Sequence, residues 1–227
     1  MNKADFLANI SSRLGRQTND PPSPRQVAGV PEFWADRVLD APELTARFVE
    51  SFAGLGGEIE CFDSESALVD RIDSFLTELA PTRVGAWGQR ANWSVNVERV
   101  LEKWDALRWD QTTPQEFANV QVSVTGCTYA IADTGTIVMT SSESQGRGTH
   151  VLPLVHLVVM TGDQIRLRLG EVFHLLTENA ASAGGSLPAY THFVSGPSRS
   201  SDIENDQSIG VHGPARVVVF LLTRDAG

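Results

Sequence analysis

Short strand-like segments alternate with helical segments through the first half of this chain. Residues 58–62 alternate apolar and polar side chains, as a strand does, and 83–87 read as a second strand. Between and around them lie helical patterns of about 10–15 residues. One begins at Pro42 and places Phe48 and Phe52 on one face. Since parallel strands need a crossover of this length, the order predicts a parallel sheet. Further elements are expected as helices at 64–79 and 93–103 and as a strand near Leu107.

The second half is richer in strands. The run at 217–222 is apolar at every position, which is typical of a strand covered on both faces. Residues 168–181 have the spacing of one helix. The predicted fold class is therefore α/β, with a mostly parallel sheet and flanking helices. The other expected strands are 120–125, 136–140, 154–160 and 192–194.

The N-terminal segment differs from the rest. Residues 2–15 have the pattern of an amphipathic helix, and 17–31 contain four prolines, which indicates an extended arm. We therefore expect an N-terminal extension, 1–31, and one α/β domain, 32–227. The sequence leaves open whether the leading helix docks on that domain or on a partner.

Composition excludes several classes of partner and cofactor. The 227 residues carry a net charge of −10, which makes nucleic acid and anionic membrane surfaces poor partners. The N-terminus lacks the apolar core of a signal peptide, so a cytoplasmic protein is expected. Cys61 and Cys127 are the two cysteines, and no C-x-x-C occurs, so we expect no zinc or iron–sulfur site in this chain. No metal site is expected from His150 and His156 either, because on one extended strand they would lie about 20 Å apart.

Three polar loops follow position 126. The first contains Asp133, Thr134, Gly135 and Thr136 and reads either as a tight turn or as a surface that faces a ligand. The second, 141–149, contains Glu143, Gly146, Arg147 and Gly148. Two glycines that flank an arginine beside serines form either an anion-binding nest or a flexible hairpin loop.

The third loop follows the expected strand at 192–194. It contains Gly196, Ser198 and Arg199, and we expect it at the carboxyl edge of a sheet, where open α/β sheets bind ligands. Downstream, His212 precedes Gly213 and is either an acid–base group or part of a surface turn. Asp202 and Glu204 are further candidate acid–base groups in the same loop.

These loops together resemble the LUD-domain family of the lactate utilization protein C type. The resemblance lies in the segments at 130–138, 146–159, 195–204 and 210–214. Ser200-Ser201 departs from the Thr-Ala that is more usual in the family. The resemblance implies a fold like that of the sugar-phosphate isomerase and CoA-transferase superfamily. It also implies a role in oxidising L-lactate to pyruvate together with iron–sulfur partner proteins, the clusters being in those partners.

The leading hypothesis is a subunit that binds a small anionic molecule where the three loops converge. Arg147 and Arg199 would bind the anion, and Glu143, Asp202, Glu204 and His212 are the candidate catalytic groups, with Asp133 as a possible orienting group. An alternative is an independent enzyme acting on a CoA thioester, a nucleotide or a sugar phosphate, with Glu143 as nucleophile. A third is a scaffold module without chemistry. Whether the chain is itself catalytic stays open at this stage.

Overall fold

The computed structural model describes residues 2–16, 37–182, 184–201 and 207–223. The chain divides into two compact units, 1–37 and 38–227. In the first, α1 (Lys3–Arg13) begins at Asn2, whose side chain accepts a hydrogen bond from the Asp5 backbone at 2.8 Å. This confirms the leading helix, while the predicted arm at 17–31 lies outside the described residues.

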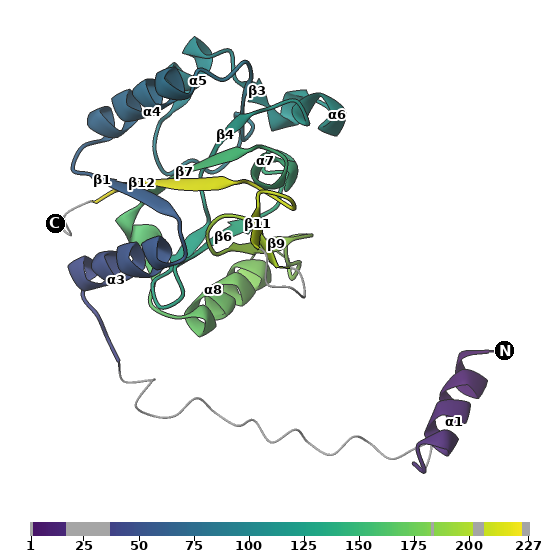
Figure 1. Cartoon of the computed structure of the whole chain (residues 1–227). Coiled ribbons are helices and arrows are strands. Elements are labelled where there is room, and N and C mark those ends of the chain that lie inside the picture. The colour runs from purple at the N-terminus through teal and green to yellow at the C-terminus, as the bar shows by residue number, and fades with distance from the viewer. Residues whose placement is uncertain (1, 17–36, 183, 202–206, 224–227) are drawn as a thin grey trace. The chain divides into compact units, whose positions relative to one another are not determined.

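The second unit contains the predicted parallel sheet. Its strand order is β1-β12-β7-β4-β2-β3, and every neighbouring pair is parallel (Figure 1). The strands are β1 (Glu58–Phe62), β2 (Val84–Ala86), β3 (Leu107–Arg108), β4 (Val122–Thr125), β7 (Val155–Thr161) and β12 (Arg216–Leu222).

Helices cover both faces of this sheet. On one face, α4 (Glu65–Leu79) and α5 (Glu98–Lys103) share a core with Phe220, and on the other, α3 (Ala41–Gly54) shares a core with Val219 (Figure 1). Successive β12 side chains thus point into two different cores, which explains the uninterrupted apolar run at 217–222. The helix predicted from 93 begins only at Glu98, where Val97 supplies no side-chain cap.

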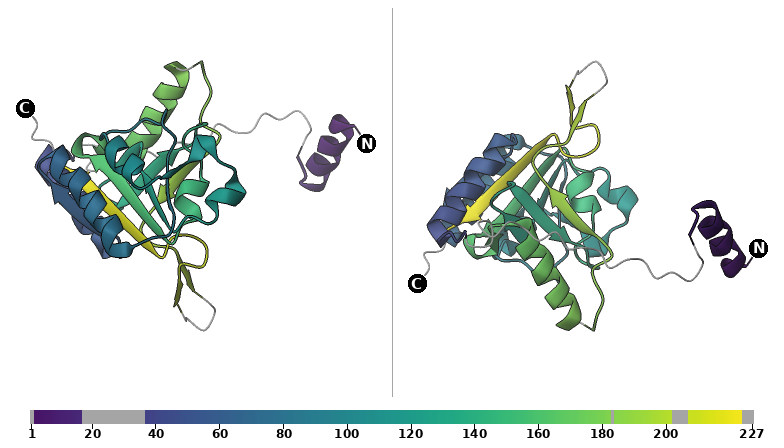
Figure 2. Two further views of the ribbon diagram at one scale, coloured as in Figure 1. Left: turned by 90° about the horizontal axis from the view of Figure 1, so that it is seen from above. Right: turned by 90° about the horizontal axis from the view of Figure 1, so that it is seen from below.

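A second sheet lies on the α3 face. Its order is β8-β5-β6-β9, and β6 pairs antiparallel with both β5 and β9. The antiparallel pairing follows from Gly135, whose left-handed φ of 55° reverses the chain between β5 and β6. Helix α8 (Leu169–Ser182) packs on this sheet through Val172 and Leu176 (Figure 2). The strands are β5 (Tyr129–Ile131), β6 (Thr136–Thr140), β8 (Ile165–Arg166) and β9 (Thr191–Val194).

Shorter elements lie in the connections between the strands. Three of them matter for the site. They are the helix α7 (Gly148–Val151) and the strands β10 (Arg199–Ser201) and β11 (Gln207–Ile209), which pair as a hairpin. The remaining short elements are η1 (Trp109–Gln111), α6 (Pro114–Phe117) and η2 (Gly162–Gln164). Within the described ranges, every helix is too short or too polar to cross a bilayer.

Candidate functional site

The first and third predicted loops meet in the structure. Because β6 begins beside the end of β9, Thr136 lies next to Ser195, and their hydroxyl oxygens are 2.9 Å apart. The hydroxyl of Thr136 also lies 2.8 Å from that of Thr134. We call these three hydroxyls and the guanidinium of Arg199 the loop junction.

The end of helix α3 positions the loop junction. Gly135 packs so tightly on the helix that a Cβ there would lie 2.5 Å from the Phe52 backbone nitrogen. Gly196, with a φ of 87°, lies against the carbonyl of Leu55, and Arg199 Nη2 donates a hydrogen bond to the same oxygen at 2.6 Å. A cation is favoured there, since the last carbonyls of a helix lack partners and carry partial negative charge.

Ser198 connects the loop junction to the segment around His212. The Ser198 backbone N–H donates to the carbonyl of Pro214 at 2.9 Å, and the His212 backbone N–H donates to Ser198 Oγ at 3.3 Å. Gly213 lies against the Ser198 side chain. The imidazole of His212 is exposed.

The third loop was expected at the carboxyl edge of the parallel sheet, and this prediction is wrong. Strand β9, which precedes Ser195, belongs to the second, mixed sheet, and residues 210–214 lead into the first residue of β12. His212 therefore lies at the amino-terminal edge of the parallel sheet. The error has a physical cause: continuous apolar segments predict strands but not the sheet in which each strand pairs.

The second loop lies apart from the other two. Arg147 stacks on Tyr190, with its guanidinium carbon 4.4 Å from the ring centre. Tyr190 pairs with Ser141 at the end of the β6–β9 ladder opposite to Thr136 and Ser195. The structure thus brings two of the three predicted loops together, and the expected convergence of all three is wrong.

The glycines of the second loop have a packing role. The ring of Trp109 covers both Gly146 and Gly148, and a side chain at either position would overlap it. Neither glycine has the left-handed φ that an alternating anion nest requires. The nest interpretation is therefore wrong, and Arg147 is the group in this loop that remains for an anion.

The remaining predicted residues are dispersed. Glu143 is exposed in the turn between Ser142 and Gln145. Asp133 lies 3.6 Å from Arg47 on α3. Asp202 and Glu204 lie outside the described residues.

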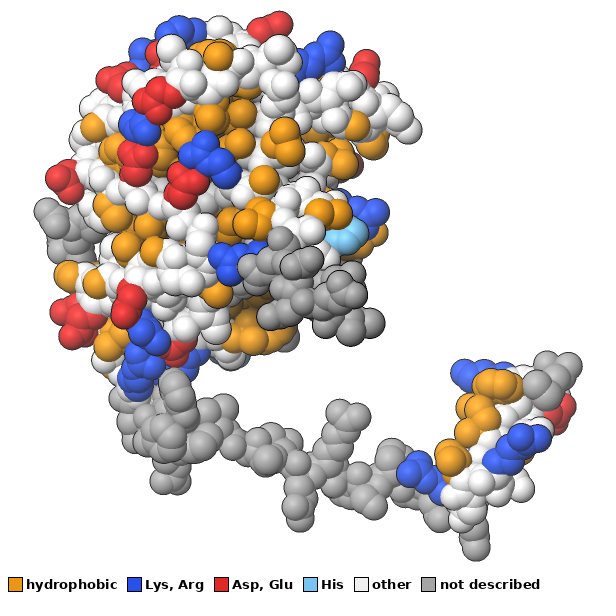
Figure 3. Space-filling view, viewed as in Figure 1, with side chains coloured by type: hydrophobic (Ala, Val, Ile, Leu, Met, Phe, Trp, Pro, Cys, Tyr) orange, Lys and Arg blue, Asp and Glu red, His pale blue; other side chains and the backbone are white. Residues whose placement is uncertain are grey.

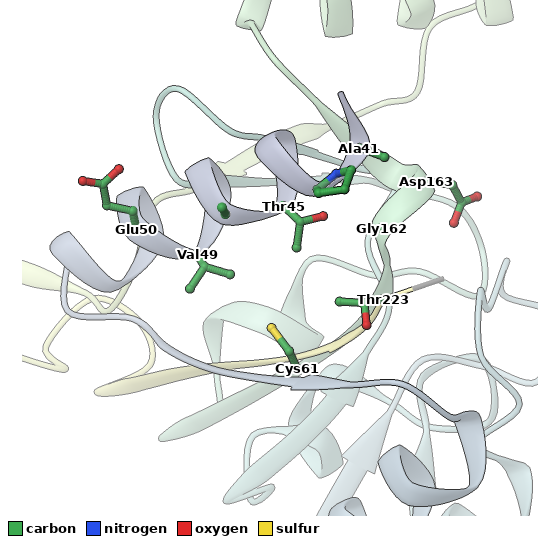
Figure 4. Close-up of a pocket in the computed structure, with 10 residues that line it drawn as sticks. Ala41, Thr45, Val49, Glu50, Cys61, Gly162, Asp163 and Thr223 are labelled. Atoms are coloured by element: carbon green, nitrogen blue, oxygen red, sulfur yellow. The ribbon is translucent and has the colours of Figure 1, made fainter. Parts of the chain in front are cut away.

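A hollow of about 1230 Å³ lies at the carboxyl ends of β1 and β12. Thr45 and Val49 of α3 face Cys61 and Thr223 across it (Figure 4). Open α/β sheets bind ligands at this edge, yet none of the described residues predicted for the site lines the hollow. Partial burial raises the pKa of the Cys61 thiol, so this thiol is not an activated nucleophile.

A row of three histidines was not predicted. His156 on β7 has Nε2 2.8 Å from the Thr125 hydroxyl, and its ring centre lies 5.9 Å from that of His150 on α7. His150 Nε2 in turn lies 2.9 Å from Nδ1 of His192 on β9. The expected separation of about 20 Å was wrong, because 148–151 form a helical turn instead of extending the strand.

Burial keeps the inner two imidazoles of this row neutral. Desolvation, and to a lesser extent His192, lower the pKa of His150 to about 4. Desolvation also holds the pKa of His156 well below its usual value. Among the residues that the structure describes, no three His, Cys, Asp or Glu side chains, this row included, are arranged to hold a metal ion. The only signal in the sequence was that four of the five histidines, the three of this row and His174, lie between 150 and 192.

Comparisons with known proteins agree with the fold. The model of the LUD domain family matches residues 45–222. Two similar proteins are both called lactate utilization protein C. The one from Halalkalibacterium halodurans is 27% identical over 96% of each chain, and the one from Anoxybacillus flavithermus is 31% identical over 96% of this chain and 98% of its own. A crystal structure of a DUF162 family protein from Deinococcus radiodurans superimposes with a TM-score of 0.60, at 23% identity, over 82% of this chain and 99% of that one.

Proposed function

This chain belongs to the LUD domain family, and from that premise we propose that it acts in lactate utilization. In this proposal it supports the oxidation of L-lactate to pyruvate together with iron–sulfur partner proteins. The observation that carries the proposal is the similarity, over nearly the whole chain, to proteins named lactate utilization protein C.

The chemistry of the reaction supports a need for partners. Oxidation of the hydroxyl carbon of lactate releases two electrons and two protons, so an electron acceptor is required. An iron–sulfur cluster is usually held by four thiolates, and this chain contains two cysteines, Cys61 and Cys127. Burial raises the pKa of Cys127 far above its usual value, which keeps it a thiol. The clusters that receive the electrons are therefore assigned to the partners.

The ligand proposed for this chain is a small anion. Lactate and pyruvate are both carboxylates, and guanidinium groups bind carboxylates through paired hydrogen bonds. The two predicted arginines lie at opposite ends of the β6–β9 ladder, Arg199 at the loop junction and Arg147 beside Tyr190. Either could bind the anion, and variants can test them separately.

If Arg199 binds the anion, Arg199→Gln should weaken binding about tenfold or more, because a charged hydrogen bond is lost. Glutamine is shorter than arginine and also loses the hydrogen bond from Nη2 to the Leu55 carbonyl, so urea unfolding must show that the variant remains folded. Arg199→Lys, which keeps the charge, should retain more of the affinity. Thermal shifts titrated with L-lactate, pyruvate and phosphate measure the effect. Unchanged titrations with Arg199→Gln would exclude Arg199 from the site.

The N-terminal helix offers a contact for a partner. Phe6, Leu7 and Ile10 of α1 and Leu14 at its C-terminal end are exposed, and Figure 3 shows apolar side chains gathered along this helix. An apolar stripe along one helix is typical of a docking element, and in this proposal its partner is another protein.

Deleting residues 1–31 should therefore abolish co-purification with the iron–sulfur partners and reduce growth on L-lactate. A matched full-length control, Ser11→Ala, should preserve both. A host without its own copy of this gene, compared on L-lactate and on glucose, provides the growth measurement. If loss of the whole gene leaves growth on L-lactate normal, the proposed function is wrong. If the deletion variant still co-purifies, the helix is not the docking element.

A further inference from the structure

The histidine row leaves buried hydrogen-bonding atoms without partners. Ser123 and His156 are 0% exposed and His150 is 6% exposed. Ser123 Oγ, His150 Nδ1 and His156 Nδ1 have no hydrogen-bond partner. Buried polar atoms are nearly always paired, because an unpaired one loses its hydration without compensation. Ser123 lies opposite His156 in the β4–β7 pairing, so these atoms belong to one buried polar region, which ends at His192.

The outer end of the row reaches the surface. His192 is half-buried, and its Nδ1 is engaged by His150 Nε2 at 2.9 Å. A neutral imidazole has two nitrogens, so Nε2 of His192 is the atom left for a ligand. The His192 ring contacts Tyr190 edge to face with centres 6.0 Å apart, and Arg147 covers Tyr190. A guanidinium and an imidazole therefore flank the same aromatic ring.

Backbone pairing holds these groups in place. The backbone N–H of Tyr190 donates to Ser141 Oγ at 2.9 Å, and the Ser141 N–H donates to the Tyr190 carbonyl at 3.0 Å. His192 lies opposite Met139 in the β6–β9 ladder. Tyr190 and His192 are thus carried by ordered strand ends, which suits a preorganised site.

We propose that Arg147, Tyr190 and His192 bind a short 2-hydroxycarboxylate, with L-lactate as the first candidate. The guanidinium binds the carboxylate, and Nε2 of His192 forms a hydrogen bond with the hydroxyl group. His150 is a positioning residue that holds the His192 ring through Nδ1. This inference rests on the proposed function, since that function makes lactate the relevant ligand.

The properties of the row support this assignment. His150 is buried, and desolvation keeps it neutral at physiological pH. The hydrogen bond between His150 Nε2 and His192 Nδ1 couples the tautomers of the two rings, because one of these nitrogens must carry the proton and the other must accept it. The site therefore distinguishes ligands by the group next to the carboxylate: a hydroxyl in lactate, a carbonyl in pyruvate, and neither in propionate.

Binding of these three acids to the full-length protein tests the inference. Isothermal titration should give a lactate affinity at least tenfold higher than that for propionate. Arg147→Gln should weaken all three acids about tenfold or more. His192→Ala should weaken lactate binding about tenfold and leave propionate binding nearly unchanged. The ratio of lactate affinity to propionate affinity then falls toward one. His150→Leu should lower the same ratio, whereas His150→Gln, which can still reach His192 Nδ1, should largely restore it.

The controls separate a binding role from structural damage. His174 lies exposed on α8, paired with Glu178, and His174→Ala should change no affinity. Equal weakening of lactate and propionate by His192→Ala, or unchanged binding with Arg147→Gln, overturns the inference. If growth on L-lactate requires the gene but the wild-type protein binds none of the three acids, the inference fails and the proposed function stands. If lactate binds selectively but growth does not require the gene, the proposed function fails instead.

Discussion

Replacing Gly135 by alanine should lower the free energy of unfolding by about 3 kcal/mol, through left-handed strain and overpacking together. Its φ of 55° disfavours a side chain, and the added Cβ would lie 2.5 Å from the Phe52 nitrogen and the Ser51 carbonyl carbon. These are backbone atoms of α3, so they cannot rotate away. The loop that carries Thr134 and Thr136 must move instead.

Gly185 provides a matched control for this variant. Its φ is 86°, and nothing lies within 4 Å of where its Cβ would be, so Gly185→Ala should cost only the conformational strain, about 1 kcal/mol. Urea unfolding of both variants measures the difference. If the two variants lose the same stability, the contact between Gly135 and α3 contributes nothing. Anion titrations of Gly135→Ala also report whether the loop junction must keep its geometry.

Lowering the pH from 7 to 5 should destabilise the protein by about 4 kcal/mol through His150 and His156. In the unfolded chain both histidines bind protons as the pH falls below about 6.5. In the folded protein burial lowers the pKa of His150 to about 4 and holds the pKa of His156 well below its usual value, so we expect neither to bind a proton in this range. Since the unfolded state binds more protons, stability falls as the pH falls.

Variants can assign this pH dependence. His156→Gln should remove about half of it, whereas His174→Gln, which changes an exposed histidine on α8, should leave it unchanged. Urea unfolding at pH 7, 6 and 5 gives the slope, and most carboxylates titrate below this range. An unchanged slope in His156→Gln would mean that His156 is protonated in the folded state.

Much of the fold could be predicted because its signals are local. The expected strand at 58–62 is β1, and the one at 136–140 is β6. The helix expected at 168–181 is α8, displaced by one residue at each end. The helix expected at 93–103 was too long, because Trp93 instead packs on Trp87 within a turn region ahead of Glu98.

The candidate site was harder to predict because its parts are distant in the chain. The sequence identified Thr134, Thr136 and Arg199 as polar residues in loops, and two of the loops do meet. It gave no reason to place Arg147 beside Tyr190, since that contact depends on the register of β6 with β9. Glycines in the second loop predicted backbone freedom, whereas their role is to accommodate Trp109.

The amino-acid sequence by itself determined where helices and strands form, because periodicity, capping and turn residues act over a few neighbours. It also determined the acidic net charge and the number of cysteines, from which the predictions about partners and cofactors were made. Only the tertiary structure decided that β6 and β9 leave the parallel sheet, that α3 holds the loop junction, and that His150, His156 and His192 form one row. Those outcomes depend on which surfaces bury one another, and close packing between distant segments leaves no local pattern in the chain.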